Sequence, residues 1–204
     1  MRKAWCGVGL WICAAGPSLA GPVTLEGVTF DDKLGGVVLH SGSGTGSLDD
    51  PFVLVEDILE DGPAVLSITG LGYDFGNRVG TRHTVGFALT KVVRNLTSRD
   101  WEVFEMEVRE ILSRTSPYED GLSFAQDADD RPFAASDRFD HAYKTDEPLD
   151  SVVFSGATVR PGETVTVRVV ITDYSPTYEF YLLQRRNAPV SGRGVMYGWL
   201  LGGP

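Results

Sequence analysis

Alternation of hydrophobic and polar residues with a period of two dominates the chain from residue 21 onward. The clearest case is the stretch 163–173, in which every second residue from 165 to 171 is Val or Ile and most residues between them are polar. β-Branched residues at this spacing are typical of a strand with one buried face. We therefore predict that Val167 and Val169 face the core and that Arg168 faces the solvent.

The same alternation predicts further strands, separated by turn sequences such as Asp61-Gly62-Pro63 and Pro161-Gly162. These strands are predicted at 23–30, 52–55, 64–69, 84–93, 122–125, 151–154 and 177–184. Only a short connection separates 163–173 from 177–184, so these two strands are predicted to form a hairpin. The stretches 41–50 and 126–148 lack periodicity and are predicted to be irregular.

Residues 101–112 fit two patterns. Trp101, Phe104 and Val108 recur at helical spacing, but Phe104, Met106 and Val108 also alternate. The turn-like sequence before them favours a strand paired with the preceding one. Several strands joined by short turns, without alternating helices, predict an all-β fold, namely an antiparallel β-sandwich.

The first twenty residues follow the order of a secretory signal peptide. Arg2 and Lys3 precede an apolar run at 4–15, Gly16-Pro17 interrupts it, and small residues lead to Ala20. We predict cleavage after Ala20 and an exported protein, periplasmic or secreted. The alternative is a buried N-terminal helix.

The predicted cleavage divides the chain into a signal peptide at 1–20, a β-sandwich domain at 21–190 and a C-terminal tail at 191–204. Cys6 and Cys13 leave with the signal peptide, so the mature chain is expected to contain neither a disulfide nor a thiolate metal site. The apolar part of the tail is too short to span a bilayer, so no membrane span is expected in the mature chain.

The charge of the chain narrows the classes of partner. Its formal net charge is −10, and removal of Arg2 and Lys3 leaves 16 basic against 28 acidic residues, a net charge of −12. This sign argues against nucleic acid and anionic lipid as partners. It suits a soluble protein and is compatible with cation binding.

Six short segments carry a resemblance to a known group of proteins: FALTKVVRNLT at 87–97, Trp101, EMEV at 105–108, VFSG at 153–156, VRPGETV at 159–165 and YEFYLLQ at 178–184. Together they resemble exported bacterial β-sandwich proteins of unknown role, many of which carry a PEP-CTERM sorting tail. The resemblance covers about half the chain and implies an immunoglobulin-like sandwich and export, but it carries over no functional residues. The C-terminus departs from the group because it lacks Pro-Glu-Pro, a membrane helix and terminal arginines.

The acidic stretch 126–148 is the predicted cation site. Calcium binds several oxygen ligands, which short aspartates on one loop can supply. The spacing differs from an EF-hand loop, since Pro132 stands where that loop needs glycine, and a solvated charge run is the alternative. Calcium is thus the only candidate cofactor, with Asp127, Asp129, Asp130, Asp137 and Asp140 as its candidate ligands.

Residues with ring side chains lie among and next to these aspartates in the sequence. Phe133, Phe139, His141 and Tyr143 are the candidate ligand-binding residues, because rings can stack on the apolar faces of sugars while polar groups bind the hydroxyls. The alternative is that the rings anchor a long loop to the sandwich.

No catalytic residues are predicted. The three histidines lack metal-ligand spacing, and no serine lies in a Gly-x-Ser-x-Gly frame. A solvated strand face explains Glu105 and Glu107 better than a glycosidase pair does. Asn95-Leu96-Thr97 matches the N-glycosylation pattern, which is short and common by chance.

We therefore expect an exported, non-enzymatic β-sandwich with a structural or recognition role in the cell envelope or outside the cell. Its partner would be a glycan or an envelope or extracellular protein. The alternatives are a carbohydrate-binding module, assisted by calcium, and an unrecognised hydrolase.

Overall fold

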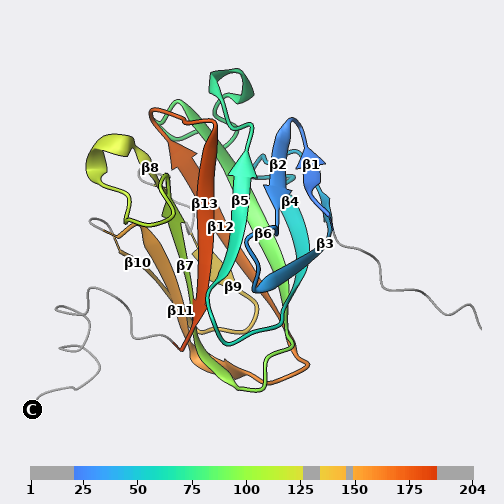
Figure 1. Ribbon diagram of the computed structural model, residues 1–204. Helices are drawn as coiled ribbons and strands as arrows, with labels where there is room; N and C mark the ends of the chain where they lie inside the picture. The colour runs from blue at the N-terminus through green and yellow to red at the C-terminus, as the bar shows by residue number, and fades with distance from the viewer. Residues whose placement is uncertain (1–20, 126–133, 146–148, 188–204) are drawn as a thin grey trace, which may run out of the picture.

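Two β-sheets pack face to face in the computed structural model, which describes residues 21–125, 134–145 and 149–187 (Figure 1). The seven-stranded sheet contains, in order, β1 (Val23–Leu25), β2 (Val28–Asp31), β5 (Ala64–Thr69), β13 (Glu179–Arg186), β7 (Trp101–Arg109), β11 (Ser151–Val159) and β10 (His141–Thr145). The six-stranded sheet contains β3 (Val37–Ser43), β4 (Phe52–Ile58), β6 (Val85–Asn95), β12 (Thr164–Asp173) and β8 (Leu122–Phe124), and β9 (Ala134–Ser136) also pairs with β12. Two 3-10 helices, η1 (Tyr73–Phe75) and η2 (Tyr118–Asp120), lie in the connections. The predicted all-β sandwich is confirmed in its two-layer architecture.

The six-stranded sheet is not purely antiparallel, which corrects the prediction. β4 and β6 are parallel neighbours, with Phe52 opposite Leu89 and Ile58 opposite Asn95. Between them the chain crosses to the other sheet to form β5 and then crosses back. Because it crosses twice, it re-enters the six-stranded sheet in its original direction.

The predicted faces of the strand at 163–173 are confirmed. In β12, Val167 is fully buried and Val169 is 2% exposed, whereas Arg168 is exposed. The strand interpretation of 101–112 is also confirmed over β7. Trp101 and Phe104, three residues apart, both lie in the core, where their rings stack with centroids 5.8 Å apart.

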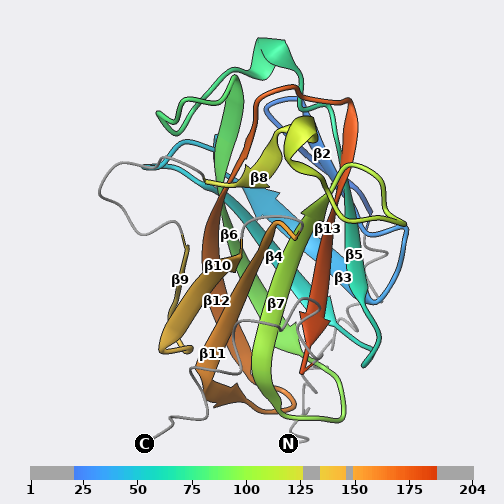
Figure 2. The ribbon, with the colours of Figure 1, turned by 90° about the vertical axis from the view of Figure 1, so that its left-hand side faces the viewer.

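Two predicted strand pairings are wrong. β12 and β13 do not form a hairpin, because they belong to different sheets, and the same holds for β6 and β7 (Figure 2). Each of these strands has an apolar face, and a short connection can pass over the end of a sandwich as well as turn within one sheet. Periodicity alone does not distinguish the two routes.

Several element boundaries also differ from those predicted. The stretch 23–30 forms two strands, because Glu26 and Gly27 adopt positive φ angles of 52° and 87° and turn the chain back on itself. β3 extends to Ser43, into one stretch predicted to be irregular, and the other such stretch contains β9 and β10. Pairing with β4, β11 and β12 makes these polar segments extended, and their own sequences do not show it.

The inner faces of both sheets form one hydrophobic core. Phe30, Phe52 and Phe87 meet near one end, with ring centroids between 5.5 and 6.2 Å apart. Edge-to-face and tilted contacts of this kind stabilise a core beyond the effect of burial alone. Within the described residues, no helix has the length and apolar character needed to cross a membrane.

Candidate functional site

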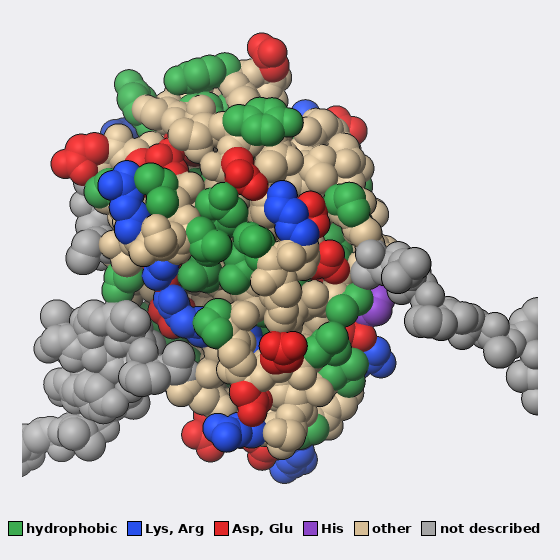
Figure 3. All heavy atoms as spheres, in the orientation of Figure 1, with side chains coloured by type: hydrophobic (Ala, Val, Ile, Leu, Met, Phe, Trp, Pro, Cys, Tyr) green, Lys and Arg blue, Asp and Glu red, His purple; other side chains and the backbone are tan. Residues whose placement is uncertain are grey.

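Three strongly exposed tyrosines lie on connections at one end of the sandwich, which we call the tyrosine end. Tyr73 is in η1, and Tyr174 and Tyr178 are in the connection between β12 and β13. Their exposed fractions are 64%, 63% and 77%. The two connections lie at the top in Figure 1, and hydrophobic side chains gather there on the surface in Figure 3. Exposed aromatic rings grouped at one end of a domain are typical of recognition surfaces, where tyrosine is enriched.

The backbone that carries two of these rings is hydrogen-bonded to residues that flank neighbouring strands. The Tyr174 carbonyl accepts a hydrogen bond of 2.8 Å from Thr84 Oγ1, and the Tyr174 N–H donates to the Gly121 carbonyl at 3.2 Å. The Tyr178 carbonyl accepts a bond of 3.0 Å from the Gly70 N–H. The connection is therefore held at both ends before any ligand arrives, which lowers the entropic cost of binding.

Local sequence explains the turn that presents Tyr174. Asp173 closes β12, and its Oδ1 accepts a hydrogen bond of 2.8 Å from the Ser175 N–H. An aspartate that bonds the backbone two residues further on favours a turn over a continued strand. Pro176 follows and removes a backbone donor.

Three carboxyl groups lie beneath this connection: Glu110 after β7, Asp120 in η2 and Asp173 at the end of β12. Burial, together with the charges of Glu110 and Asp120, raises the pKa of Asp173 to about 7. Burial and the charge of Asp120 also raise the pKa of Glu110, opposed by a hydrogen bond with Thr177. Burial raises the pKa of Asp120 in the same way. Burial is the main cause for all three groups, and Asp173 is the one whose pKa comes to lie near neutral pH.

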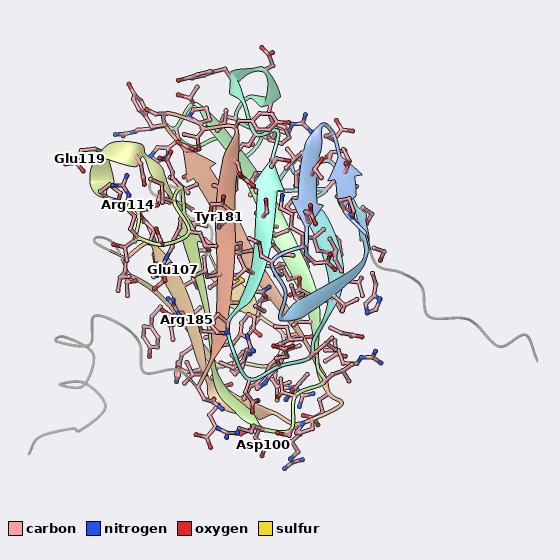
Figure 4. All side chains as sticks on the ribbon, viewed as in Figure 1. Asp100, Glu107, Arg114, Glu119, Tyr181 and Arg185 are labelled. Atoms are coloured by element: carbon pink, nitrogen blue, oxygen red, sulfur yellow. The ribbon has the colours of Figure 1, made fainter. Side chains whose placement is uncertain are left out.

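The outer face of the seven-stranded sheet carries a second group of charges, which we call the charged ladder: Glu105, Glu107, Arg109 and Arg185. Arg185 pairs with both glutamates, at 3.1 Å from Nε to Oε2 of Glu105, and Arg109 pairs with Glu107. Tyr181, Glu107 and Arg185 follow one another along this face in Figure 4.

The prediction that Glu105 and Glu107 lie on a solvated strand face is wrong. Glu105 is only 2% exposed and Glu107 is fully buried. The arginine side chains, 14% and 16% exposed, lie against these carboxylates and neutralise them. Sequence periodicity placed both glutamates on the outer face but did not reveal that arginines from β7 and β13 shield them there.

Three of the four candidate ligand-binding residues lie among the described residues, in and just before β10. Phe139 is 6% exposed and packs against Phe154 with centroids 6.3 Å apart, as the anchoring alternative describes. His141 and Tyr143 lie on the edge strand β10 with their rings 5.9 Å apart, and Tyr143 is 46% exposed. Phe133 lies outside the described residues.

The candidate calcium ligands are only partly described, since Asp127, Asp129 and Asp130 lie outside the described residues. Asp137 Oδ1 accepts a hydrogen bond of 2.8 Å from the Thr166 N–H, so it holds its own segment to β12. Asp140 packs close to Gly156. Across 21–125, 134–145 and 149–187, no three His, Cys, Asp or Glu side chains are grouped to hold a metal ion.

The histidines lie in separate parts of the fold. His40 Nε2 is 2.8 Å from Asp57 Oδ2, and Arg94 holds the same carboxylate with bonds of 2.8 and 2.6 Å. His83 packs its ring near Tyr174, and His141 is on β10. The His40–Asp57 contact thus belongs to a polar network that joins β3, β4 and β6 through the Asp57 carboxylate.

Sequence reasoning missed Tyr73, Tyr174 and Tyr178. The signal present was a tyrosine inside a turn sequence, as in Asp173-Tyr174-Ser175-Pro176. An aromatic residue in a turn has no strand face to bury it, and that makes exposure the expected outcome. The topology then brings two connections that cross between the sheets, β5–β6 and β12–β13, to one end.

Comparison of the chain with protein-family models, with curated proteins and with solved structures gives no match.

Proposed function

We propose that this protein is an exported, non-enzymatic, immunoglobulin-like sandwich that recognises a glycan through its tyrosine end. The observation that carries the proposal is the set of three exposed tyrosines, two of them on a connection hydrogen-bonded to the residue after β5 and to the residues before β6 and β8. Export and the immunoglobulin-like character rest on the N-terminal pattern and on the resemblance to exported bacterial sandwiches.

A glycan fits the chemistry of this end better than other ligands do. The face of a tyrosine ring packs on the apolar C–H face of a sugar, and its hydroxyl remains free to bond. The carboxyl groups of Glu110, Asp120 and Asp173 lie close by, and the chain carries a net charge of −10. This charge repels sulfated and uronic-acid sugars, so the preferred ligand is a neutral glycan.

The test is a glycan array probed with the protein lacking residues 1–20. We expect binding to one class of neutral glycans and loss of that binding when Tyr73, Tyr174 and Tyr178 are replaced by Ala together. Tyr143→Ala is the matched control, since it removes an exposed tyrosine from β10, away from this end. Binding that depends on Tyr143 and is indifferent to the other three would overturn the proposal.

A hydrolase is the second candidate, and the carboxyl cluster favours it. Glycoside hydrolysis needs one carboxyl that keeps its proton near neutral pH and a second that is ionised. Asp173, with a pKa of about 7, meets the first condition, and Glu110 and Asp120 are its neighbours. Release of reducing ends from the bound glycan, abolished by Asp173→Asn, would support this function. Intact glycan after prolonged incubation would exclude it for that ligand.

A further inference from the structure

The turn that presents Tyr174 is bonded to buried carboxyl groups at the tyrosine end. Asp173 is 1% exposed, and its Oδ1 accepts the hydrogen bond of 2.8 Å from the Ser175 N–H that closes the turn. Two residues further on, Thr177 is hydrogen-bonded to the Glu110 side chain. Two carboxyl groups thus hold the connection between β12 and β13, so a change in their charge acts directly on the segment that carries two of the tyrosines.

The third carboxyl group, Asp120, is placed near Asp173 by the pairing of β8 with β12. Leu122 in β8 lies directly opposite Asp173, and its N–H donates a hydrogen bond of 3.0 Å to Asp120 Oδ1. The next residue after Asp120 is bonded to the same connection, because the Gly121 carbonyl accepts a bond of 3.2 Å from the Tyr174 N–H. The three carboxyl groups and the tyrosine-bearing connection are therefore parts of one hydrogen-bonded unit.

The charged groups around Asp173 are mostly negative. Glu110 and Asp120 both act on it, and Glu119 in η2 adds a negative charge that acts on Asp120. Arg114, on the connection between β7 and η2, is a positive group that acts on Glu110 and Asp120 (Figure 4). An ionised Asp173 would therefore face two carboxyl groups while it is shielded from water.

A histidine lies on the β6 side of Asp173. Val85 in β6 is opposite Asp173, and His83, two residues before Val85, lies with its ring 6.4 Å from the ring of Tyr174. Histidine in general changes charge near neutral pH. An experiment on the pH dependence of this end must therefore distinguish His83 from Asp173.

Opposing effects decide which form of Asp173 favours the closed turn, in which the bond to Ser175 is made. That bond favours the ionised carboxylate, whereas burial and the charges of Glu110 and Asp120 favour the protonated acid. Burial and charge prevail, because the pKa of Asp173 is raised from 3.8 to about 7. In a released turn, water reaches the carboxyl group and its pKa returns towards 3.8. The closed turn therefore binds the proton more tightly than the released turn does.

We propose that protonation of Asp173 controls the tyrosine end: the β12–β13 connection holds Tyr174 and Tyr178 in place while Asp173 is protonated and is released when Asp173 ionises. This regulation rests on the proposed glycan site. Since the glycan binds the closed form, its affinity falls as the pH rises from the acidic range to pH 8. The protein thus binds its glycan in an acidic medium and releases it in an alkaline one.

Linkage between the proton and the turn sets the size of the effect. For a group whose pKa drops from about 7 to 3.8 on release, the ratio of released to closed turn rises about 30-fold between pH 5.5 and pH 8. Burial also raises the pKa of Glu110 and Asp120, so these groups act in the same direction. Below about pH 4 both forms of the turn are protonated, and the ratio no longer depends on pH.

Amide hydrogen exchange of residues 174–178 in the purified protein tests the switch without any glycan. The protection factor, corrected for the intrinsic effect of pH on exchange, should fall at least about tenfold between pH 5.5 and pH 8. In Asp173→Asn it should change less than about twofold, because Asn keeps an oxygen for the Ser175 N–H but does not ionise. Equal falls in the two proteins, or no fall in the parent, would overturn the proposal.

His83→Gln is the matched control, since it removes the imidazole beside Tyr174 and leaves Asp173 unchanged. We expect this variant to keep the fall in protection that the parent shows. A fall that disappears in His83→Gln and persists in Asp173→Asn would assign the pH dependence to the histidine and refute the role of Asp173.

Titration of the best glycan-array ligand separates this regulation from the glycan site itself. The dissociation constant of the parent should be at least about threefold higher at pH 8 than at pH 5.5, and that of Asp173→Asn should be the same at both. Equal affinity of the parent at the two pH values would overturn the regulation and leave the glycan site intact. If no glycan binds at either pH, the proposed function fails, and the exchange measurement decides on the Asp173 switch by itself.

Discussion

Asn95 Oδ1 accepts two hydrogen bonds from Thr97, one from its N–H at 2.9 Å and one from its Oγ1 at 2.7 Å. The Asn95 amide nitrogen donates to the carbonyls of Arg99 and Val159, and the side chain is fully buried. The Asn-Leu-Thr sequence therefore closes the turn between β6 and β7. In the folded protein its amide points inward, where a glycosylating enzyme would not reach it.

Replacement of Asn95 by Ala should lower the free energy of unfolding by about 3 kcal/mol, because several buried backbone and side-chain groups lose their partners at once. Denaturant unfolding followed by circular dichroism measures the change. Leu96→Ala, in the same turn but 41% exposed, is the control and should change stability by less than about 1 kcal/mol. Equal effects of the two variants would contradict the described turn.

Val167→Asp should be far more destabilising than Arg168→Asp. Val167 is fully buried between the sheets, so the variant places an unpaired carboxylate in the core, at a cost of several kcal/mol. Arg168 is exposed one residue further on, so its replacement should cost about 1 kcal/mol or less. Thermal melting of both variants tests the register of β12, and similar melting temperatures would show that the register is wrong.

Asp173 should make the protein less stable as the pH rises. Its pKa is raised from 3.8 to about 7, so the folded state holds the proton more tightly than the unfolded chain does. The contribution of Asp173 to the free energy of unfolding is neutral below about pH 4 and becomes unfavourable between pH 4 and 7. Above pH 7, Asp173 lowers the free energy of unfolding by roughly 4 kcal/mol. Asp173→Asn removes the charge, so we expect it to raise the melting temperature at pH 8 and to leave it nearly unchanged at pH 4.

Glu163→Gln is a control for which the expected change in stability has the opposite sign. A hydrogen bond from the Arg160 N–H, together with the charges of Arg138 and Arg160, lowers the pKa of Glu163. Its contribution to stability is present above the unfolded pKa and is lost as the pH falls. Glu163→Gln should therefore lower the melting temperature at neutral pH. An Asp173→Asn variant less stable than the parent at pH 8 would refute the account of the carboxyl cluster.

The sequence was sufficient to predict the most regular strands, whereas β3, β9 and β10 were not predicted. In β12 and β5, β-branched and aliphatic residues define the element directly, and their predicted bounds differ from those observed by at most one residue. The pairing of strands was not predictable in the same way. β12 and β13 would show the same alternation of buried and exposed residues whether they pair in one sheet or face each other across the core. Only the full set of tertiary contacts determines which arrangement forms.

The candidate site was less accessible to sequence reasoning. Tyr174 and Tyr73 are distant in sequence, and they share an end of the molecule only because η1 and the β12–β13 connection lie at the same end of the sandwich. The burial of Glu107 likewise depends on Arg185 from a strand far along the chain. Acidic residues in one long segment gave a stronger sequence signal, although a local run of charge does not by itself form a site.

The most direct test of the glycan-binding proposal is the dissociation constant of the best array ligand, measured by isothermal titration with Tyr178→Ala and Tyr178→Phe. Stacking on an exposed ring predicts that Tyr178→Phe binds within about threefold of the parent and that Tyr178→Ala binds at least about tenfold more weakly, a loss of about 1.4 kcal/mol or more. Tyr143→Ala should bind like the parent. Unchanged affinity in Tyr178→Ala, or a loss confined to Tyr143→Ala, would contradict recognition at the tyrosine end.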